Sequence, residues 1–118
     1  MMPSNVSELK TASLDEQKRA VPRYTFVAST DVIDSVTSTR LAGRVSEISR
    51  NGCYIDILNP LPVGTPISLL ISRDQGQFVT KARIVYVHDS MGMGIAFVDP
   101  SSDQLGILDS WLAQLPEG

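Results

Sequence analysis

The segment between Tyr24 and Val98 constrains the fold most, because its β-branched and aromatic residues gather in short runs and show no helical period. Clusters of turn-forming residues separate the runs at positions 51–52, 59–64, 73–76 and 89–90. The pattern predicts strands near residues 24–29, 32–40, 44–48, 53–58, 66–72, 77–87 and 92–98, some of which can merge. We therefore expect a fold dominated by β-structure, an antiparallel barrel of six to seven strands, because closing the sheet removes exposed edges.

Alternation along the predicted strands indicates which side chains face the core. Phe78, Ile84 and Tyr86 fall on one face of the segment 77–87. Arg44, however, shares a face with the apolar Ile48. Either one of these two lies at the rim of the barrel, or the glycine before Arg44 introduces a bulge.

The end of the chain changes to a helical period. Ser101 can cap a helix, and apolar residues then recur at three- and four-residue spacing before a proline stops the pattern. The pattern predicts a helix over residues 101–115 that lies against the barrel. Trp111 stands in the middle of its apolar stripe and is interpreted as a packing anchor.

The start of the chain carries little pattern. Residues 1–12 are polar and are expected to form a disordered tail. Ser13 and Glu16 are spaced as a capping box for a short helical turn, which Pro22 must end. The expected organisation is one domain over residues 13–116, with an N-terminal turn and arginine loop at 13–23, a barrel at 24–98 and a helix at 101–115.

Composition narrows the class of protein. The 118 residues suffice for one hydrophobic core, and 42% apolar with 19% charged residues is ordinary for a soluble domain. No apolar run approaches the length of a membrane span and no secretory leader is evident, so we expect a cytoplasmic protein without membrane insertion. With Cys53 as the single cysteine and His88 as the single histidine, neither a disulfide nor a metal centre is expected.

Charge is unevenly distributed along the chain. The net charge is −3, but residues 18–50 hold six basic side chains against three acidic ones, a local charge of +3 that leaves −6 elsewhere. A small dianion would be attracted to this segment, whereas a long polyanion would be repelled by the remainder. We therefore expect no DNA or RNA partner.

Two polar clusters lie within this basic segment. Arg19 and Arg23 are four residues apart beside a proline that prevents a continuous helix, an arrangement suited to binding an anion from an irregular segment. Glu47 and Ser49 fall on the same face of a predicted strand, which Gly52 follows at a turn. Arginine side chains can bind phosphate, and a carboxylate can accept hydrogen bonds from the edges of bases. Together the two clusters indicate a nucleotide ligand.

The order of these features resembles the PilZ domain family over residues 18–115. The family consists of six-stranded barrels, many of which are receptors for the second messenger cyclic di-GMP. The resemblance implies that Arg19 and Arg23 form the family's Arg-x-x-x-Arg pair, and that Ser49 and Gly52 belong to its Asp/Asn-x-Ser-x-x-Gly motif. Lys18, directly before the first arginine, could reach a second ligand molecule.

Glu47 departs from the family pattern, which has Asp or Asn at this position. The carboxylate moves outward by about one methylene, and a misplaced bond to it could cost about 1.5–3 kcal/mol, or roughly 10- to 150-fold in affinity. Glu47 could instead pair with Arg23 or Arg44 in the empty protein. Ser49 could likewise serve only to close its turn.

Two functions follow from the resemblance. The first is a non-catalytic receptor for cyclic di-GMP, in which the arginine loop becomes ordered on binding and is presented to an unidentified downstream protein. The second is a degenerate PilZ domain that does not bind nucleotide and acts through protein contacts. No enzymatic activity or cofactor is expected, and the sequence leaves the oligomeric state open.

Overall fold

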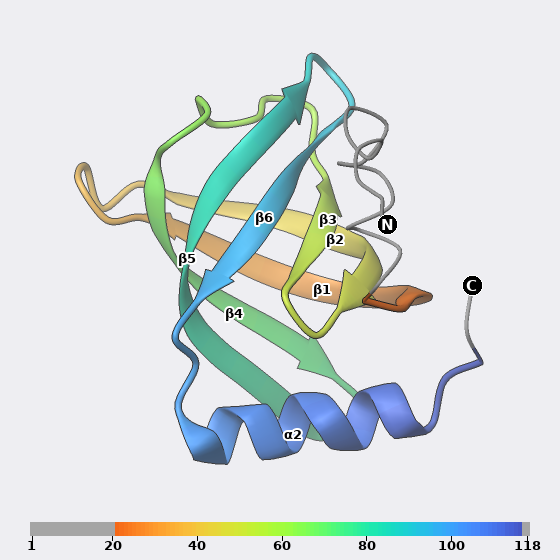
Figure 1. Ribbon diagram of the computed structural model, residues 1–118. Helices are drawn as coiled ribbons and strands as arrows, with labels where there is room; N and C mark the ends of the chain where they lie inside the picture. The colour runs from red at the N-terminus through yellow and green to blue at the C-terminus, as the bar shows by residue number, and fades with distance from the viewer. Residues whose placement is uncertain (1–20, 117–118) are drawn as a thin grey trace, which may run out of the picture.

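The computed structural model describes residues 21–116, in which six antiparallel strands close into a barrel and one helix covers one end (Figure 1). Neighbouring strands follow the order β1-β2-β3-β6-β5-β4, and β4 pairs with β1 to complete the circle. The closed antiparallel barrel predicted from the short strand runs is confirmed. Its elements are β1 (Arg23–Asp34), β2 (Arg40–Ser49), β3 (Gly52–Asp56), β4 (Pro66–Arg73), β5 (Gly76–His88), β6 (Gly92–Val98) and α2 (Ser102–Ala113).

Some of the predicted strands are wrong in their extent. Segments 24–29 and 32–40 merge into β1, as the prediction allowed, but β1 ends at Asp34, residues 35–39 form a turn, and Arg40 already belongs to β2. The Asp34 carboxylate accepts hydrogen bonds from the backbone N–H groups of Val36 at 2.8 Å and Thr37 at 3.3 Å, which bends the chain. The strand expected at 53–58 starts one residue earlier and ends at Asp56.

A bulge in β2 resolves the conflict between Arg44 and Ile48. The register with β3 shifts between Val45 and Glu47, so Val45 and Ile48 both point into the core although they are three residues apart. Arg44 points outward and pairs with Asp56 at 3.0 Å. Of the two alternatives drawn from the sequence, a bulge is therefore the one observed, but it lies between Val45 and Glu47 and not at the glycine before Arg44.

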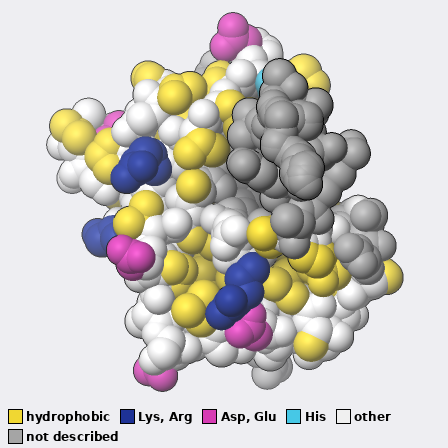
Figure 2. All heavy atoms as spheres, viewed as in Figure 1, with side chains coloured by type: hydrophobic (Ala, Val, Ile, Leu, Met, Phe, Trp, Pro, Cys, Tyr) yellow, Lys and Arg dark blue, Asp and Glu magenta, His cyan; other side chains and the backbone are white. Residues whose placement is uncertain are grey.

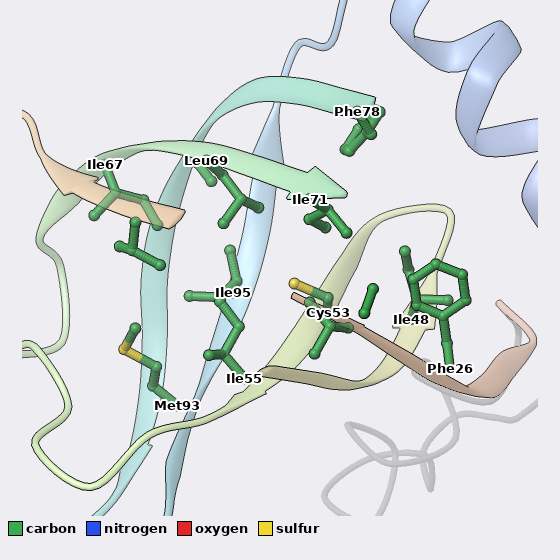
Figure 3. Close-up of a cluster of buried hydrophobic side chains, with 14 of the residues drawn as sticks. Phe26, Ile48, Cys53, Ile55, Ile67, Leu69, Ile71, Phe78, Met93 and Ile95 are labelled. Carbon is green, nitrogen blue, oxygen red and sulfur yellow. The ribbon is translucent and has the colours of Figure 1, made fainter. Parts of the chain in front are cut away.

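The core is a single apolar cluster inside the barrel (Figure 3). Each strand contributes inward side chains, and fully burying one such side chain typically stabilises the fold by about 1.5–3 kcal/mol. Cys53 is one of these buried residues, and burial raises the pKa of its thiol far above the ordinary value. Cys53 therefore packs as a small apolar residue and is not a reactive thiolate.

Helix α2 lies across the end of the barrel where β4 meets β5 (Figure 1). The Ser101 side chain caps it by accepting a hydrogen bond from the Gln104 N–H at 3.3 Å. Leu108 is fully buried, and the Trp111 ring packs against Phe26 with centroids 5.4 Å apart. The predicted C-terminal helix is confirmed, and Trp111 packs as expected.

Several sequence expectations fall outside the described residues. These are the tail at 1–12, the helical turn beginning at Ser13, and the side chains of Lys18 and Arg19. Within residues 21–116, no helix combines the length and apolarity that a membrane crossing requires.

Candidate functional site

A surface hollow of about 310 Å³ lies where the β2–β3 turn meets β5 and β6. Hollows from about 300 Å³ upward are typical of small-molecule sites. Four of the six residues proposed from the sequence line it, namely Arg23, Glu47, Ser49 and Gly52. The antiparallel pairing of β1 with β2 brings the two motifs together, because Arg23 lies opposite Ser49 in the register.

Arg23 and Glu47 form an ion pair at the hollow. The Nη1 and Oε1 atoms are 3.4 Å apart, and the two side chains are 45% and 44% exposed. An ion pair so exposed contributes at most about 1 kcal/mol to stability. A ligand can therefore take over both groups at a small cost in free energy. The alternative in which Glu47 pairs with an arginine therefore holds in this structure, with Arg23 as its partner.

Ser49 closes the β2–β3 turn. Its hydroxyl accepts hydrogen bonds from the N–H groups of Asn51 and Gly52, both at 3.2 Å, and is also 3.3 Å from the Gly52 carbonyl oxygen. Arg50, the next residue, points away toward α2 and pairs through Nε with Asp109 at 2.8 Å. The turn-closing interpretation of Ser49 is thus observed, and contact between Ser49 and a ligand stays a prediction.

Gly52 has a structural reason to be glycine. A Cβ atom at this position would overlap the backbone carbonyl oxygen of Ile95 in the neighbouring strand β6. The backbone of β6 also donates a hydrogen bond from Phe97 N–H to Asn51 O at 2.9 Å. The close approach of two backbones therefore requires glycine here, whether or not a ligand is bound.

Two aromatic side chains that sequence reasoning did not assign to the site also line the hollow. Tyr54 from β3 and Tyr86 from β5 are stacked, with ring centroids 6.1 Å apart and planes at 29°. Alternation placed Tyr86 on the inner face with Ile84, but the β5–β6 register shifts between these two residues and Tyr86 is only partly buried. The exposed Val85 lies beside it in the wall.

The environment of Tyr86 keeps its phenol protonated. Burial is the largest cause that raises the pKa of Tyr86, and the Glu47 carboxylate raises it further, while Arg23 acts in the opposite direction. Burial also raises the pKa of Tyr54, with a contribution from Asp56. The hollow thus offers a guanidinium, a carboxylate and two neutral phenol rings.

Positive charge is scattered on the face shown in Figure 2. Among the described residues of that face, Lys and Arg side chains lie apart from one another, some of them beside Asp or Glu and most among apolar atoms. No continuous basic stripe is visible among the described residues of this face.

Comparison with known families agrees with this geometry. The family model described as PilZ domain matches residues 17–114, which is most of the chain. The chain belongs to the PilZ domain family. The resemblance drawn from the two motifs is confirmed.

Three solved structures share the barrel at low sequence identity. The PilZ domain of CeSA from a cellulose synthesizing bacterium is 19% identical, with a TM-score of 0.62 over 77% of this chain and 94% of that one. The PilZ domain with c-di-GMP of YcgR from Escherichia coli is 15% identical, with a TM-score of 0.71 over 84% and 92%. The Bacillus subtilis inhibitor of motility (MotI/DgrA) is 12% identical, with a TM-score of 0.64 over 80% and 51%. At these identities the matches establish the fold, and a comparison with curated proteins gave no match.

The described part of this PilZ domain contains no cluster of three His, Cys, Asp or Glu side chains that could hold a metal ion. The guanidinium of Arg23 can contact an anion, the Glu47 carboxylate can accept hydrogen bonds, and the tyrosine rings offer flat surfaces to a planar group.

Proposed function

We propose that this PilZ domain is a non-catalytic cytoplasmic receptor for cyclic di-GMP. The observation that carries the proposal is the Arg23–Glu47 pair, which stands at a ligand-sized hollow walled by Tyr54 and Tyr86. Cyclic di-GMP consists of two phosphates and two guanines, so it needs cations, hydrogen-bond acceptors and flat apolar surfaces together. The hollow supplies all three within one site.

Each group has a distinct role in the proposal. Arg23 contacts a phosphate or the O6 and N7 atoms of a guanine, both of which a guanidinium can bind with two hydrogen bonds. Glu47 accepts hydrogen bonds from the guanine N1–H and N2–H₂ groups. The ring of Tyr86 stacks on a base, a contact worth about 1–3 kcal/mol in other nucleic-acid sites. Arg19 and Lys18 add further cations from the segment before residue 21.

The proposed switch is competition for Arg23. In the empty protein Glu47 holds Arg23 weakly, and a ligand takes both groups into stronger, less solvated contacts. The segment that carries Lys18 and Arg19 then becomes ordered over the ligand and presents a new surface to a downstream protein. The related MotI/DgrA structure is described as an inhibitor of motility, which is consistent with a PilZ protein that acts on another process.

A second candidate function is a PilZ domain that does not bind nucleotide and serves as an adaptor for protein contacts. Two observations favour it. Glu47 replaces the shorter acid or amide of the family motif and is paired with Arg23, and the Ser49 hydroxyl is occupied by the turn. In this case the hollow would no longer bind nucleotide.

Isothermal titration of cyclic di-GMP into the full chain separates the two functions. The receptor function requires saturable binding, with the nucleotide recovered unchanged afterwards. Arg23→Ala should weaken binding. Arg40→Ala serves as a matched arginine control, because Arg40 lies at the end of β2 away from Glu47 and Ser49, and it should leave binding unchanged. An absence of heat at every accessible ligand concentration would leave the adaptor function.

A further inference from the structure

Gly94 lies between the two tyrosines that wall the hollow. In the β3–β6 register it is opposite Tyr54, and in the β5–β6 register it is opposite Tyr86. Strands β3 and β5 flank β6, and two strands separated by a third are about 9–10 Å apart. The ring centroids of Tyr54 and Tyr86 are nevertheless only 6.1 Å apart. The rings therefore lean toward each other over the strand between them.

The missing side chain at Gly94 is what permits this lean. A Cβ atom there would overlap the ring of Tyr86, and one at Gly92 would overlap the ring of Tyr54. Aromatic rings that cover a glycine on a neighbouring strand are a known device for stabilising sheets. The two glycines of the Gly92-Met-Gly94 pattern in β6 thus leave the space that the rings of Tyr54 and Tyr86 occupy.

His88 completes the arrangement from the end of β5. Its Nδ1 atom is 2.9 Å from the Tyr54 hydroxyl, and its ring lies 5.7 Å from that of Tyr54 and 5.4 Å from that of Tyr86. The hydrogen bond joins β3 to β5 across the glycine-bearing strand β6. We call Tyr54, Tyr86 and His88 the aromatic bridge.

We propose that Tyr54 and His88 are positioning residues of the ligand site, because their hydrogen bond fixes the Tyr86 ring over Gly94 as one wall of the hollow. The inference rests on the proposed function, since a wall matters only to a site that receives a ligand. Tyr86 itself would touch the ligand, whereas His88 is not part of the lining and acts through Tyr54. Because the Tyr86 ring is already held in place in the empty protein, less conformational entropy is lost when a ligand binds.

Three variants isolate the hydrogen bond. Tyr54→Phe removes the hydroxyl and keeps the ring, and His88→Ala removes Nδ1 together with the rest of the imidazole. His88→Asn restores a hydrogen-bonding group, because its side-chain amide is as many bonds from the backbone as the histidine Nδ1 and can accept through Oδ1 or donate through Nδ2. Tyr24→Phe is the matched control, since Tyr24 is a partly buried tyrosine in β1 that does not line the hollow.

The position of the ring is read in the ligand-free protein by proton NMR. The Tyr86 ring covers Gly94, so a Gly94 Hα resonance should be shifted upfield by the ring current. We expect Tyr54→Phe and His88→Ala to reduce that shift, and His88→Asn and Tyr24→Phe to retain it. A shift that persists unchanged in both of the first two variants would overturn the positioning role, whatever the ligand does.

The consequence for binding is read by titration with cyclic di-GMP. Tyr54→Phe and His88→Ala should each weaken binding by roughly 2- to 10-fold, the usual range for one neutral hydrogen bond. The double variant should be no weaker than the poorer single variant, because both changes break the same bond. If the unmodified protein binds while neither single variant loses affinity, the inference fails. If the unmodified protein does not bind at all, the receptor function fails, and the NMR shift still decides whether the bond positions the ring.

Discussion

Arg23 and Glu47 face each other at the hollow with 3.4 Å between Nη1 and Oε1, which links the two sequence motifs in one contact. Truncating Arg23 to Ala should weaken cyclic di-GMP binding by roughly 10- to 150-fold, because a hydrogen bond to a charged group contributes about 1.5–3 kcal/mol. The melting temperature should barely change, since both side chains are half exposed. Calorimetric titration with Arg40→Ala alongside checks this, and equal losses in the two variants would contradict a specific role for Arg23.

Shortening Glu47 tests whether its extra methylene matters. Glu47→Asp moves the carboxylate toward the backbone and restores the acid of the family motif, so we expect tighter binding by up to roughly tenfold. Glu47→Gln keeps the length and removes the charge, and it should weaken binding. The measurement is the dissociation constant of each variant. Binding that appears only in Glu47→Asp would mean that the natural chain is the adaptor form.

Two glycines should respond in opposite ways to the same substitution. Gly52→Ala forces a methyl group onto the Ile95 carbonyl oxygen and should destabilise the fold by about 1–3 kcal/mol or more. Gly106→Ala, in the exposed middle of α2 with open space around it, should stabilise the fold by about 0.5–1 kcal/mol. Urea unfolding measures both, and a neutral Gly52→Ala would show that the two backbones are not in close contact.

Alkaline pH should reveal the burial of Tyr86. Burial and Glu47 raise its pKa in the folded state, so its contribution to stability is complete below the unfolded-state value of about 10 and is lost as pH rises through the folded-state pKa. Tyr86→Phe should therefore flatten the fall of unfolding free energy above about pH 10. Urea unfolding across this range gives the two curves. Parallel curves for parent and variant would contradict the assignment.

Local patterns sufficed for much of the fold and for the polar residues that line the hollow. Alternation and turn residues located the strands, and Arg23, Glu47, Ser49 and Gly52 were recognisable because each motif is contiguous. The turn after Asp34 was missed because it contains neither glycine nor proline and depends on one carboxylate accepting two backbone hydrogen bonds.

The aromatic residues that line the hollow were missed for a different reason. Tyr54 and Tyr86 lie on strands that are not adjacent and meet only because Gly94 leaves space between them. Strict alternation also assigned Tyr86 to the interior, since nothing in the local sequence marks the register shift after Ile84. The available signal was the Gly92-Met-Gly94 pattern, whose meaning depends on the order of strands in the barrel.

An NMR titration of the isotopically labelled full chain with cyclic di-GMP decides whether the hollow is a receptor site for this nucleotide. We expect saturable shifts of backbone amides that concentrate at Asn51, Gly52 and Tyr86, around the hollow. The turn at residues 35–39, which does not line the hollow, should stay unchanged. Spectra that do not respond to the nucleotide, or shifts confined to residues away from the hollow, would contradict the receptor function.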